Sequence, residues 1–369
     1  MSRTVAILRK EFLQMRRDRM TVGLAFLMPL IQLLLFGYAI QTDVRHIPTA
    51  VFDQAHSAAS RDLLEAFTAS GYFDLTVVAD SPEAVSQAID RGRAKAGILI
   101  PPDLDRCLAR GDSAAVQVVV DASDNLVANQ ALAVANAIGL LKSQAVLVRR
   151  LGISGPLYDV RMRPWYNPDG ITAFYMVPAL LGTIVTMTMV ILTAAAIVRE
   201  KERGTLEQLI VTPVRSLELM VGKIVPYIAL GYVQITVALL VAVTVFRVPI
   251  RGSVLELYLL TLFFITASLG LGILLSTLAQ NQLQAFQLSF LVLLPSILLS
   301  GFLFPREAMP EVVYYLSTVI PLTYYLQIIR GIVLKGVGLP YLVGQVAALL
   351  VFSVVFVTLS AVRFKKRIA

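Results

Sequence analysis

Residues 257–304 read LYLLTLFFITASLGLGILLSTLAQNQLQAFQLSFLVLLPSILLSGFLF, a stretch that contains no Asp, Glu, Lys or Arg. An α-helix rises about 1.5 Å per residue and needs about 20 residues to cross a hydrocarbon core of about 30 Å. The stretch is therefore long enough for two membrane crossings. Its polar segment AQNQLQ, at 279–284, separates the predicted spans 257–279 and 284–304.

Four further charge-free runs predict four more spans, at 21–40, 171–198, 224–246 and 336–362. The chain of 369 residues is 57% hydrophobic and 15% charged, with a mean hydropathy of +0.75, whereas about 25% of the residues of ordinary soluble domains are charged. This composition argues against a soluble enzyme and predicts an α-helical polytopic membrane protein with six transmembrane helices. The first run follows a basic start, as in a signal peptide, but it is longer than the apolar region of such peptides, so we expect an uncleaved anchor.

The basic residues predict the orientation of the spans. Six Lys and Arg residues lie in 1–20, five in the 199–223 loop and four in the 363–369 tail, against two in 247–256 and three in 305–335. Because short cytoplasmic flanks are enriched in Lys and Arg, we expect the N and C termini and the 199–223 loop in the cytoplasm. The membrane surface then accounts for the net charge of +8, and no nucleic-acid partner is expected.

The block 41–170 is predicted to face outward as an inserted extracytoplasmic α/β domain. Short β-type runs, beginning with IPTAVFD, alternate there with helical patterns and end in a long helical pattern from about residue 125 to 150. Ser81 before Pro82 predicts a capped helix start. We expect His46 and His56 on the surface and Cys107 packed as a small apolar side chain, with no metal site and no cofactor.

Two segments outside the spans are predicted to be helical. Residues 1–20 place Val5, Leu8, Phe12 and Met15 at helical spacing, which predicts a cytoplasmic amphipathic helix at the interface; a frayed basic tail is the alternative. In 305–335, the apolar segment 312–329 is long enough for a seventh crossing. The proline in its middle and its paired tyrosines favour external short or re-entrant helices instead.

The chain contains no G-x-x-x-x-G-K-[ST] sequence, so we do not expect it to hydrolyse nucleotides itself. The six predicted spans contain no ionisable Asp, Glu, Lys, Arg or His residue, which disfavours proton-coupled transport. If the protein moves a substrate uphill, the energy is therefore expected to enter through a cytoplasmic partner, and the protein is not expected to be an enzyme.

The 199–223 loop, REKERGTLEQLIVTPVRSLELMVGK, is the predicted contact for that partner. Thr205 and Gln208 form a capping box, Gly204 permits a sharp turn before it, and Pro213 ends the short helix. An ordinary charged loop that follows the positive-inside rule is the alternative interpretation.

Two segments resemble type-2 ABC exporter permeases: REKERGTLEQLIVTP at 199–213, and LSGFLFPREAMPEVVYYLSTVIPLTYYLQIIRGIVLKG at 299–336. The layout of one span, a large outer domain and five further spans is similar as well. The resemblance implies a membrane subunit that works as a dimer, or with a similar permease, above two cytoplasmic ABC ATPase subunits. It also implies a bacterial inner membrane and permits a periplasmic adaptor and an outer-membrane channel as further partners.

The resemblance assigns site residues by position. On the coupling motif fall Glu200, Glu202, Gly204, Thr205, Glu207 and Pro213. On the second motif fall Gly301, Pro305, Pro310, Pro321 and Arg330. We expect Glu202 and Glu207 to contact the ATPase. The second set has two interpretations, an external gate or vestibule and a group of turn residues that shape short helices.

Thr183, Thr186 and Gln234 are polar residues in apolar spans, as expected either for a substrate path or for hydrogen bonds between helices. Without a charged residue in the spans, an amphiphilic substrate such as a drug or a lipid is favoured. The leading hypothesis is therefore the permease subunit of an ABC exporter. The alternatives are a membrane receptor or sensor whose 41–170 domain binds a ligand, and a membrane-embedded enzyme that acts on lipids, for which no catalytic set is recognisable.

Overall fold

The computed structural model describes residues 3–39, 44–151, 165–204 and 216–363. The chain divides into two compact units, one formed by Gln41–Arg163 and the other by Met1–Ile40 together with Pro164–Ala369. The two units differ in secondary structure. The first is an α/β unit and the second is helical.

The α/β unit is organised around a four-stranded sheet in the order β2-β1-β3-β4. β1 pairs in parallel with both β2 and β3, and β4 is antiparallel to β3. The strands are β1 (Ile47–Asp53), β2 (Phe73–Val78), β3 (Ala96–Ile100) and β4 (Gln117–Val120). Strand β3, one of the two inner strands, is covered on both faces: four of its five residues are buried.

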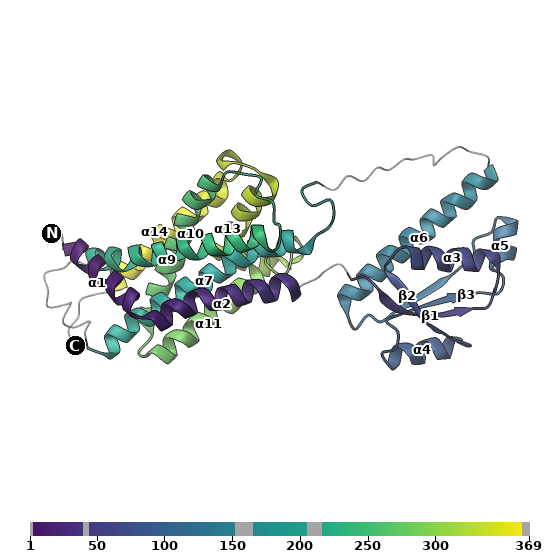
Figure 1. Ribbon diagram of the computed structural model, residues 1–369, viewed down its shortest axis with the longest axis horizontal. Helices are drawn as coiled ribbons and strands as arrows, with labels where there is room; N and C mark the ends of the chain where they lie inside the picture. Colours follow the sequence, from purple (N-terminus) through teal and green to yellow (C-terminus); the bar gives the residue numbers. More distant parts are fainter. Residues whose placement is uncertain (1–2, 40–43, 152–164, 205–215, 364–369) are drawn as a thin grey trace. The chain divides into compact units, whose positions relative to one another are not determined.

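Helices cover both faces of this sheet, with α3, α5 and α6 on one face and α4 on the other (Figure 1). They are α3 (Ala58–Ala69), α4 (Pro82–Asp90), α5 (Leu104–Arg110) and α6 (Asn125–Leu151). The predicted start of α4 is confirmed, because Ser81 Oγ accepts a hydrogen bond from the backbone N of Ala84 at 3.1 Å and Pro82 occupies the first turn. His46 and His56 are exposed, as predicted, and Cys107 is half-buried.

The long helix α6 is apolar enough, over Leu126–Arg149, to cross a membrane by length and composition. The contacts of α6 place it instead in the core of the α/β unit. Ala131 and Ile138 are buried in the core that also contains Ile47 and Ile98 of the sheet, so α6 is an integral part of the α/β unit. The leucines on its other side, such as Leu140, are exposed.

The helical unit contains a helix at each of the six predicted spans, which confirms a helical polytopic membrane protein. Its long helices are α1 (Arg3–Arg17), α2 (Arg19–Ala39), α7 (Thr172–Glu202), α9 (Ser216–Thr244), α10 (Val254–Leu278), α11 (Gln282–Leu299) and α14 (Val343–Arg363). Over the described residues, α7, α9, α10, α11 and α14 are long and apolar enough to span a membrane, and α2 contributes the shorter apolar stretch Ala25–Tyr38.

The predicted start of the last span at residue 336 is wrong. Gly336 has a left-handed backbone, with φ of +70°, and ends a π-helical turn over Gly331–Lys335. A 3-10 turn at Leu339–Tyr341 follows, and α14 begins only at Val343. The charge-free run is longer than the helix because turn residues without charge extend it.

Two short helices, α12 (Glu311–Ser317) and α13 (Pro321–Arg330), occupy the region predicted to be short or re-entrant. The chain bends by 82° between α12 and the helical segment Pro321–Lys335 that α13 begins. Pro321 occupies the first turn of α13, where its missing N–H costs no hydrogen bond.

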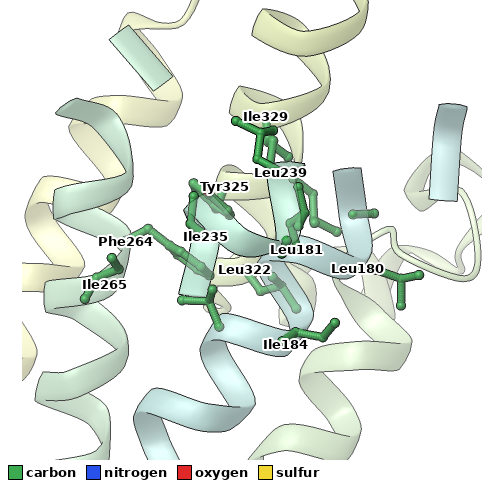
Figure 2. Close-up of a cluster of buried hydrophobic side chains, with 14 of the residues drawn as sticks. Leu180, Leu181, Ile184, Ile235, Leu239, Phe264, Ile265, Leu322, Tyr325 and Ile329 are labelled. Atoms are coloured by element: carbon green, nitrogen blue, oxygen red, sulfur yellow. The ribbon is translucent and has the colours of Figure 1, made fainter. Parts of the chain in front are cut away.

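The core of the helical unit lies where α7, α9, α10 and α13 meet (Figure 2). Phe264 of α10 and Tyr325 of α13 stack with ring centroids 3.9 Å apart, and both are fully buried. Gly182 allows α13 to lie close to α7 as well, because a Cβ there would lie 2.9 Å from the ring of Tyr325. The short helix α13 is thereby fixed against the long helices.

Residues 3–17 form a helix, and the side of α1 that packs on the protein is not made of its apolar residues alone. Ile7 and Glu11 are buried, whereas Val5 and Phe12 are 44% and 53% exposed. Ile7 packs against Gly222 of α9, where the absence of a side chain lets the two helices approach closely. Of the four apolar residues at helical spacing, Val5 and Phe12 are exposed, whereas Leu8 and Met15 are half-buried; the role of α1 as an interfacial helix stays a prediction.

Candidate functional site

The end of α7 leads into the predicted coupling segment, and its last charged residues contact four different elements. Arg199 Nη1 donates a hydrogen bond to Asp18 Oδ2, between α1 and α2, at 3.1 Å. Lys201 Nζ donates to the carbonyl oxygen of Ala279, at the end of α10, at 3.2 Å. These contacts fix the end of α7 on two sides.

Glu200 lies in a cluster of four charged residues, Lys10, Glu11, Glu200 and Lys223, which we call the Glu200 cluster. Lys10 Nζ is 2.6 Å from Glu200 Oε1, and Lys223 Nζ is 2.7 Å from Glu200 Oε2. The same two ammonium groups lie 3.2 and 2.9 Å from Glu11 Oε1. The side chains of Glu200 and Lys223 are only 6% and 5% exposed, so each of these charges depends on its partners.

The surroundings of Lys10 favour its charged form. Burial lowers the pKa of Lys10, but its hydrogen bonds and ion pairs with Glu200 and Glu11 outweigh this effect, so the pKa lies above its ordinary value. Lys10 and Glu11 come from α1, Glu200 from α7 and Lys223 from α9. The cluster therefore joins the helix before the coupling segment to the helix after it.

Glu202 caps a neighbouring helix. Its carboxylate accepts hydrogen bonds from the backbone N of Gln282, at 2.8 Å, and from the Gln282 side chain, at the start of α11. A carboxylate at this place stabilises the helix N-terminus. Glu202 thus forms hydrogen bonds within the chain. Its predicted contact with an ATPase stays a prediction.

Gly204 turns the chain away from α7, with φ of +68°, a conformation that favours glycine. This agrees with the sharp turn predicted there. Three predicted coupling residues, Thr205, Glu207 and Pro213, lie outside the described residues, and so does the predicted capping box.

The residues of the second motif occupy the ends of short elements. Gly301 follows α11 in a left-handed conformation, with φ of +85°. Pro305 and Pro310 precede the 3-10 turn Arg306–Ala308 and α12, and Pro321 begins α13. These positions fit the interpretation as turn residues, and a gating role stays a prediction.

Arg330 joins this region to α7. Its Nη1 donates to the carbonyl oxygen of Gly301 at 3.0 Å, and its guanidinium carbon lies 3.7 Å from the centre of the Tyr175 ring. Tyr175 Oη also donates to the Gly301 carbonyl, at 3.4 Å. We call Tyr175, Gly301 and Arg330 the Tyr175 junction. Arg330 Nε and Nη2 are buried and have no hydrogen-bond partner in the described part of the chain.

Comparison with known proteins decides the family. A family model described as ABC-2 family transporter protein matches residues 19–362. The chain belongs to the ABC-2 transporter family. It is 32% identical to the probable multidrug ABC transporter permease YbhS of Escherichia coli (strain K12), over 99% of this chain and 97% of that protein. It is 28% identical to the probable multidrug ABC transporter permease YbhR of the same organism, over 98% of each chain.

The inner membrane transport permease YhhJ of Escherichia coli (strain K12) is also similar, with 29% identity over 87% of this chain and 86% of that protein. Family and relatives together establish a type-2 ABC permease, the transmembrane subunit of an ABC transporter. The resemblance found in the two motifs is thereby confirmed.

The predicted substrate-path residues of this ABC-2 permease are buried and form hydrogen bonds. The hydroxyl groups of Thr183 and Thr186 donate to carbonyl oxygens one turn earlier in α7, at 3.1 and 3.0 Å. Gln234 Nε2 donates to the Ala25 carbonyl and to Thr188 Oγ1, at 3.2 and 2.9 Å. Gln234 thus joins α9 to α2 and α7, and Thr188 borders a cavity that the two other threonines do not line.

Sequence reasoning missed Lys10, Glu11, Lys223 and Tyr175. The partners of the Glu200 cluster are far apart in sequence, and no local spacing predicts their meeting. One signal was available, because Lys223 directly precedes a charge-free run and Glu11 lies next to the apolar Phe12. A charge at the edge of a span requires a partner or access to water.

Proposed function

We propose that this ABC-2 permease is the membrane subunit of an exporter driven by a separate ABC ATPase, which docks on the 199–223 loop. One observation carries the proposal: the Glu200 cluster and the cap formed by Glu202 tie both flanks of the predicted coupling segment to α1, α9 and α11. A displacement of that segment by an ATPase is then transmitted to several helices at once.

The proposed cycle uses two copies of the permease, or this permease and a similar one, with two ATPase subunits below. ATP-driven approach of the ATPases moves the coupling segments, and the dimer alternates between inward-facing and outward-facing or closed states. The buried ion pairs favour movement of the α7 end as a unit, because leaving one buried charge without its partner costs about 3–5 kcal/mol.

The proposed substrate is amphiphilic, drug-like or lipid-like. The absence of charged residues from the predicted spans supports this class, and two relatives carry the word multidrug in their names. The proposed location is a bacterial inner membrane with both termini in the cytoplasm, in agreement with the basic flanks and with the name of the relative YhhJ. A periplasmic adaptor and an outer-membrane channel are further proposed partners.

Co-purification tests the ATPase partner. The full chain, tagged at its C-terminus, is extracted from its native membrane in a mild detergent, and the proteins that accompany it are identified by mass spectrometry. We expect an ABC ATPase in a stoichiometric amount. Repeated recovery of the chain alone, or with a signalling protein, overturns the proposal and favours the sensor hypothesis for the 41–170 domain.

Charge reversal tests the loop. The double variant Glu202→Lys and Glu207→Lys is expected to abolish transport, since it removes a carboxylate from the start of α11 and two from the coupling motif. Insertion into the membrane is expected to stay normal. The matched control is Asp62→Lys, which reverses an exposed carboxylate of the α/β unit. Wild-type transport by the double variant removes the loop from the mechanism.

A further inference from the structure

Helix α1 meets two neighbouring helices close to the points where their predicted spans begin. It ends at Arg17, just before α2 starts at Arg19, and its residue Ile7 packs against Gly222 of α9. The predicted spans of α2 and α9 begin at residues 21 and 224. Because both contacts lie next to these positions, the axis of α1 follows the cytoplasmic boundary of the bilayer in the proposed orientation.

The outward side of α1 combines exposed apolar and basic residues. Val5, Phe12 and Leu13 are 44%, 53% and 43% exposed. Arg9 and Arg16 are exposed too, and together with Val5 and Phe12 they have the spacing i, i+4, i+7 and i+11 of a single helix face. Large apolar side chains that are exposed beside arginines are typical of a helix that lies on a membrane surface.

The charge on this side is positive and has no partner within the chain. Arg9, Arg16 and Arg17 are exposed, and none of them forms an ion pair among the residues that the structure describes. The carboxylates of α1 and of the residue that follows it are engaged elsewhere, Glu11 with two lysines and Asp18 with an arginine of α7. The exposed side of α1 therefore complements an anionic surface, and guanidinium groups bind phosphate oxygens particularly well.

We propose that the outward face of α1, formed by Val5, Arg9, Phe12 and Arg16, binds anionic phospholipids of the cytoplasmic leaflet. The apolar side chains enter the boundary of the acyl chains, and the guanidinium groups bind the lipid phosphates. We call this surface the α1 outer face. The inference rests on the proposed function for its orientation, and it adds a regulator to the coupling site.

The regulation follows from the opposite side of the same helix. Lys10 and Glu11 belong to the Glu200 cluster, which joins α1 to α7 and α9. Anionic lipid that holds the α1 outer face on the membrane thereby holds the end of α7, from which the predicted coupling segment starts.

Quenching of a tryptophan on α1 by brominated lipid measures the lipid preference. The full chain carries Phe12→Trp, and Trp165→Phe removes its natural tryptophan. It is reconstituted without ATPase in mixtures of phosphatidylglycerol and phosphatidylcholine, one of which is brominated. We expect phosphatidylglycerol to be preferred at position 12 at least about fivefold, the factor expected for one basic residue close to an anionic surface.

Charge removal tests the assignment in the same background. Arg9→Gln combined with Arg16→Gln is expected to reduce the preference to less than about twofold. The matched control, Arg106→Gln with Arg110→Gln, removes two exposed arginines from α5 of the α/β unit and should leave the preference unchanged. Size-exclusion chromatography establishes that each variant is folded. An α1 outer face without a preference, or a preference that survives the removal of Arg9 and Arg16, overturns the lipid site.

Hydrogen exchange at the last turn of α7 tests the transmission. Its amides should exchange about threefold more slowly in phosphatidylglycerol nanodiscs than in phosphatidylcholine nanodiscs. Lys10→Met removes the ion pair between α1 and Glu200 and should abolish this difference, while the preference at position 12 falls less than about twofold. Equal exchange of the unaltered chain in both lipids overturns the regulatory part of the proposal.

These results are separable from the exporter proposal. A lipid preference that depends on Arg9 and Arg16, in a chain that recovers no ABC ATPase, keeps the lipid site and overturns the ATP-driven function. If the chain shows no lipid preference, and the double arginine variant no longer recovers the ATPase, then α1 contacts the ATPase. That outcome keeps the function and overturns the lipid site.

Discussion

At one end of α7, Glu200 is held by two lysines at 2.6 and 2.7 Å, and a second carboxylate neutralises the excess charge. Near the other end, Arg330 lies over the ring of Tyr175 and donates one hydrogen bond, while two of its nitrogens have no partner in the described residues. The first arrangement pairs each charge, and the second leaves buried donors unsatisfied. An unsatisfied buried donor costs about 1–3 kcal/mol.

The difference indicates which end of α7 rearranges more easily. The Glu200 cluster loses several favourable contacts if any one helix moves away, so it favours a rigid unit. The Tyr175 junction gains hydrogen bonds if water or a partner reaches Arg330. We therefore expect conformational change to begin at the Tyr175 junction, and the following predictions test this contrast.

Lys223→Met is expected to have the largest effect. It leaves Glu200 and Glu11 with one shared lysine in a buried site, and removing one member of a buried ion pair costs about 3–5 kcal/mol. Thermal unfolding in detergent, followed by size-exclusion chromatography, measures the loss. The control Lys142→Met breaks the ion pair with Asp62, which is 68% exposed, and should cost about 1 kcal/mol or less.

The double variant Lys223→Met and Glu200→Gln sharpens this test, because it removes one positive and one negative charge together. It should recover part of the stability that the single variant loses. A single variant as stable as Lys142→Met contradicts the view that the cluster is a rigid unit.

Arg330→Lys is expected to have a smaller effect on stability, about 1–2 kcal/mol. Lysine keeps the charge, but it lacks the planar guanidinium that stacks on Tyr175 and bonds the Gly301 carbonyl. Because we expect the junction to move during transport, the transport rate should fall more than the stability does. If the transport rate falls only as far as the loss of stability explains, Arg330 has a structural role only. Arg363→Lys, on an exposed residue at the end of α14, is the control.

The half-buried ion pair Lys95–Asp121 of the α/β unit is expected to give the smallest effect and provides a comparison outside the helical unit. Hydrogen bonds from Lys95 and from the side chain and backbone of Ser123 lower the pKa of Asp121 from 3.8 to about 2. A lowered pKa means that the pair stabilises β3 and β4 above pH 3.8 and that this contribution is lost as the pH falls toward 2.

Asp121→Asn should remove this acid dependence. Hydrogen exchange of β3 and β4 in the full chain, compared between variant and wild type at pH 5 and at pH 2.5, measures it. We expect a difference at pH 5 that shrinks at pH 2.5. A difference that grows as the pH falls contradicts the direction of the pKa shift.

Much of the fold could be predicted because the physical signals are local. A charge-free run has few alternatives to a membrane helix, and Ser81 followed by Pro82 is sufficient to place a helix start. Local signals mislead where they agree with two different structures. The run that begins at residue 336 includes an uncharged turn before α14, and α6 passes a composition test for a span although its residues pack on a sheet.

The candidate site was predictable only in part. The motif at 199–213 identified Glu200 and Glu202, because their spacing resembles a known family. Their partners were not predictable, since Lys10 and Lys223 meet Glu200 through the packing of three helices. Periodicity also gave no sign that Glu11 of α1 is buried, because its charge is compensated by lysines from its own helix and from α9.

The anchoring of α7 near both ends has a consequence for the lipid environment. From Tyr175 to Arg199 the helix rises about 36 Å, at about 1.5 Å per residue, and a side chain near each end contacts a neighbouring element. A helix held in this way has little freedom to tilt by itself when the bilayer becomes thinner or thicker, so the mismatch falls on the lipids. The transport rate of this permease should therefore depend on the acyl-chain length of the surrounding lipids. The optimum should be set by the distance along α7 between the Tyr175 junction and Arg199.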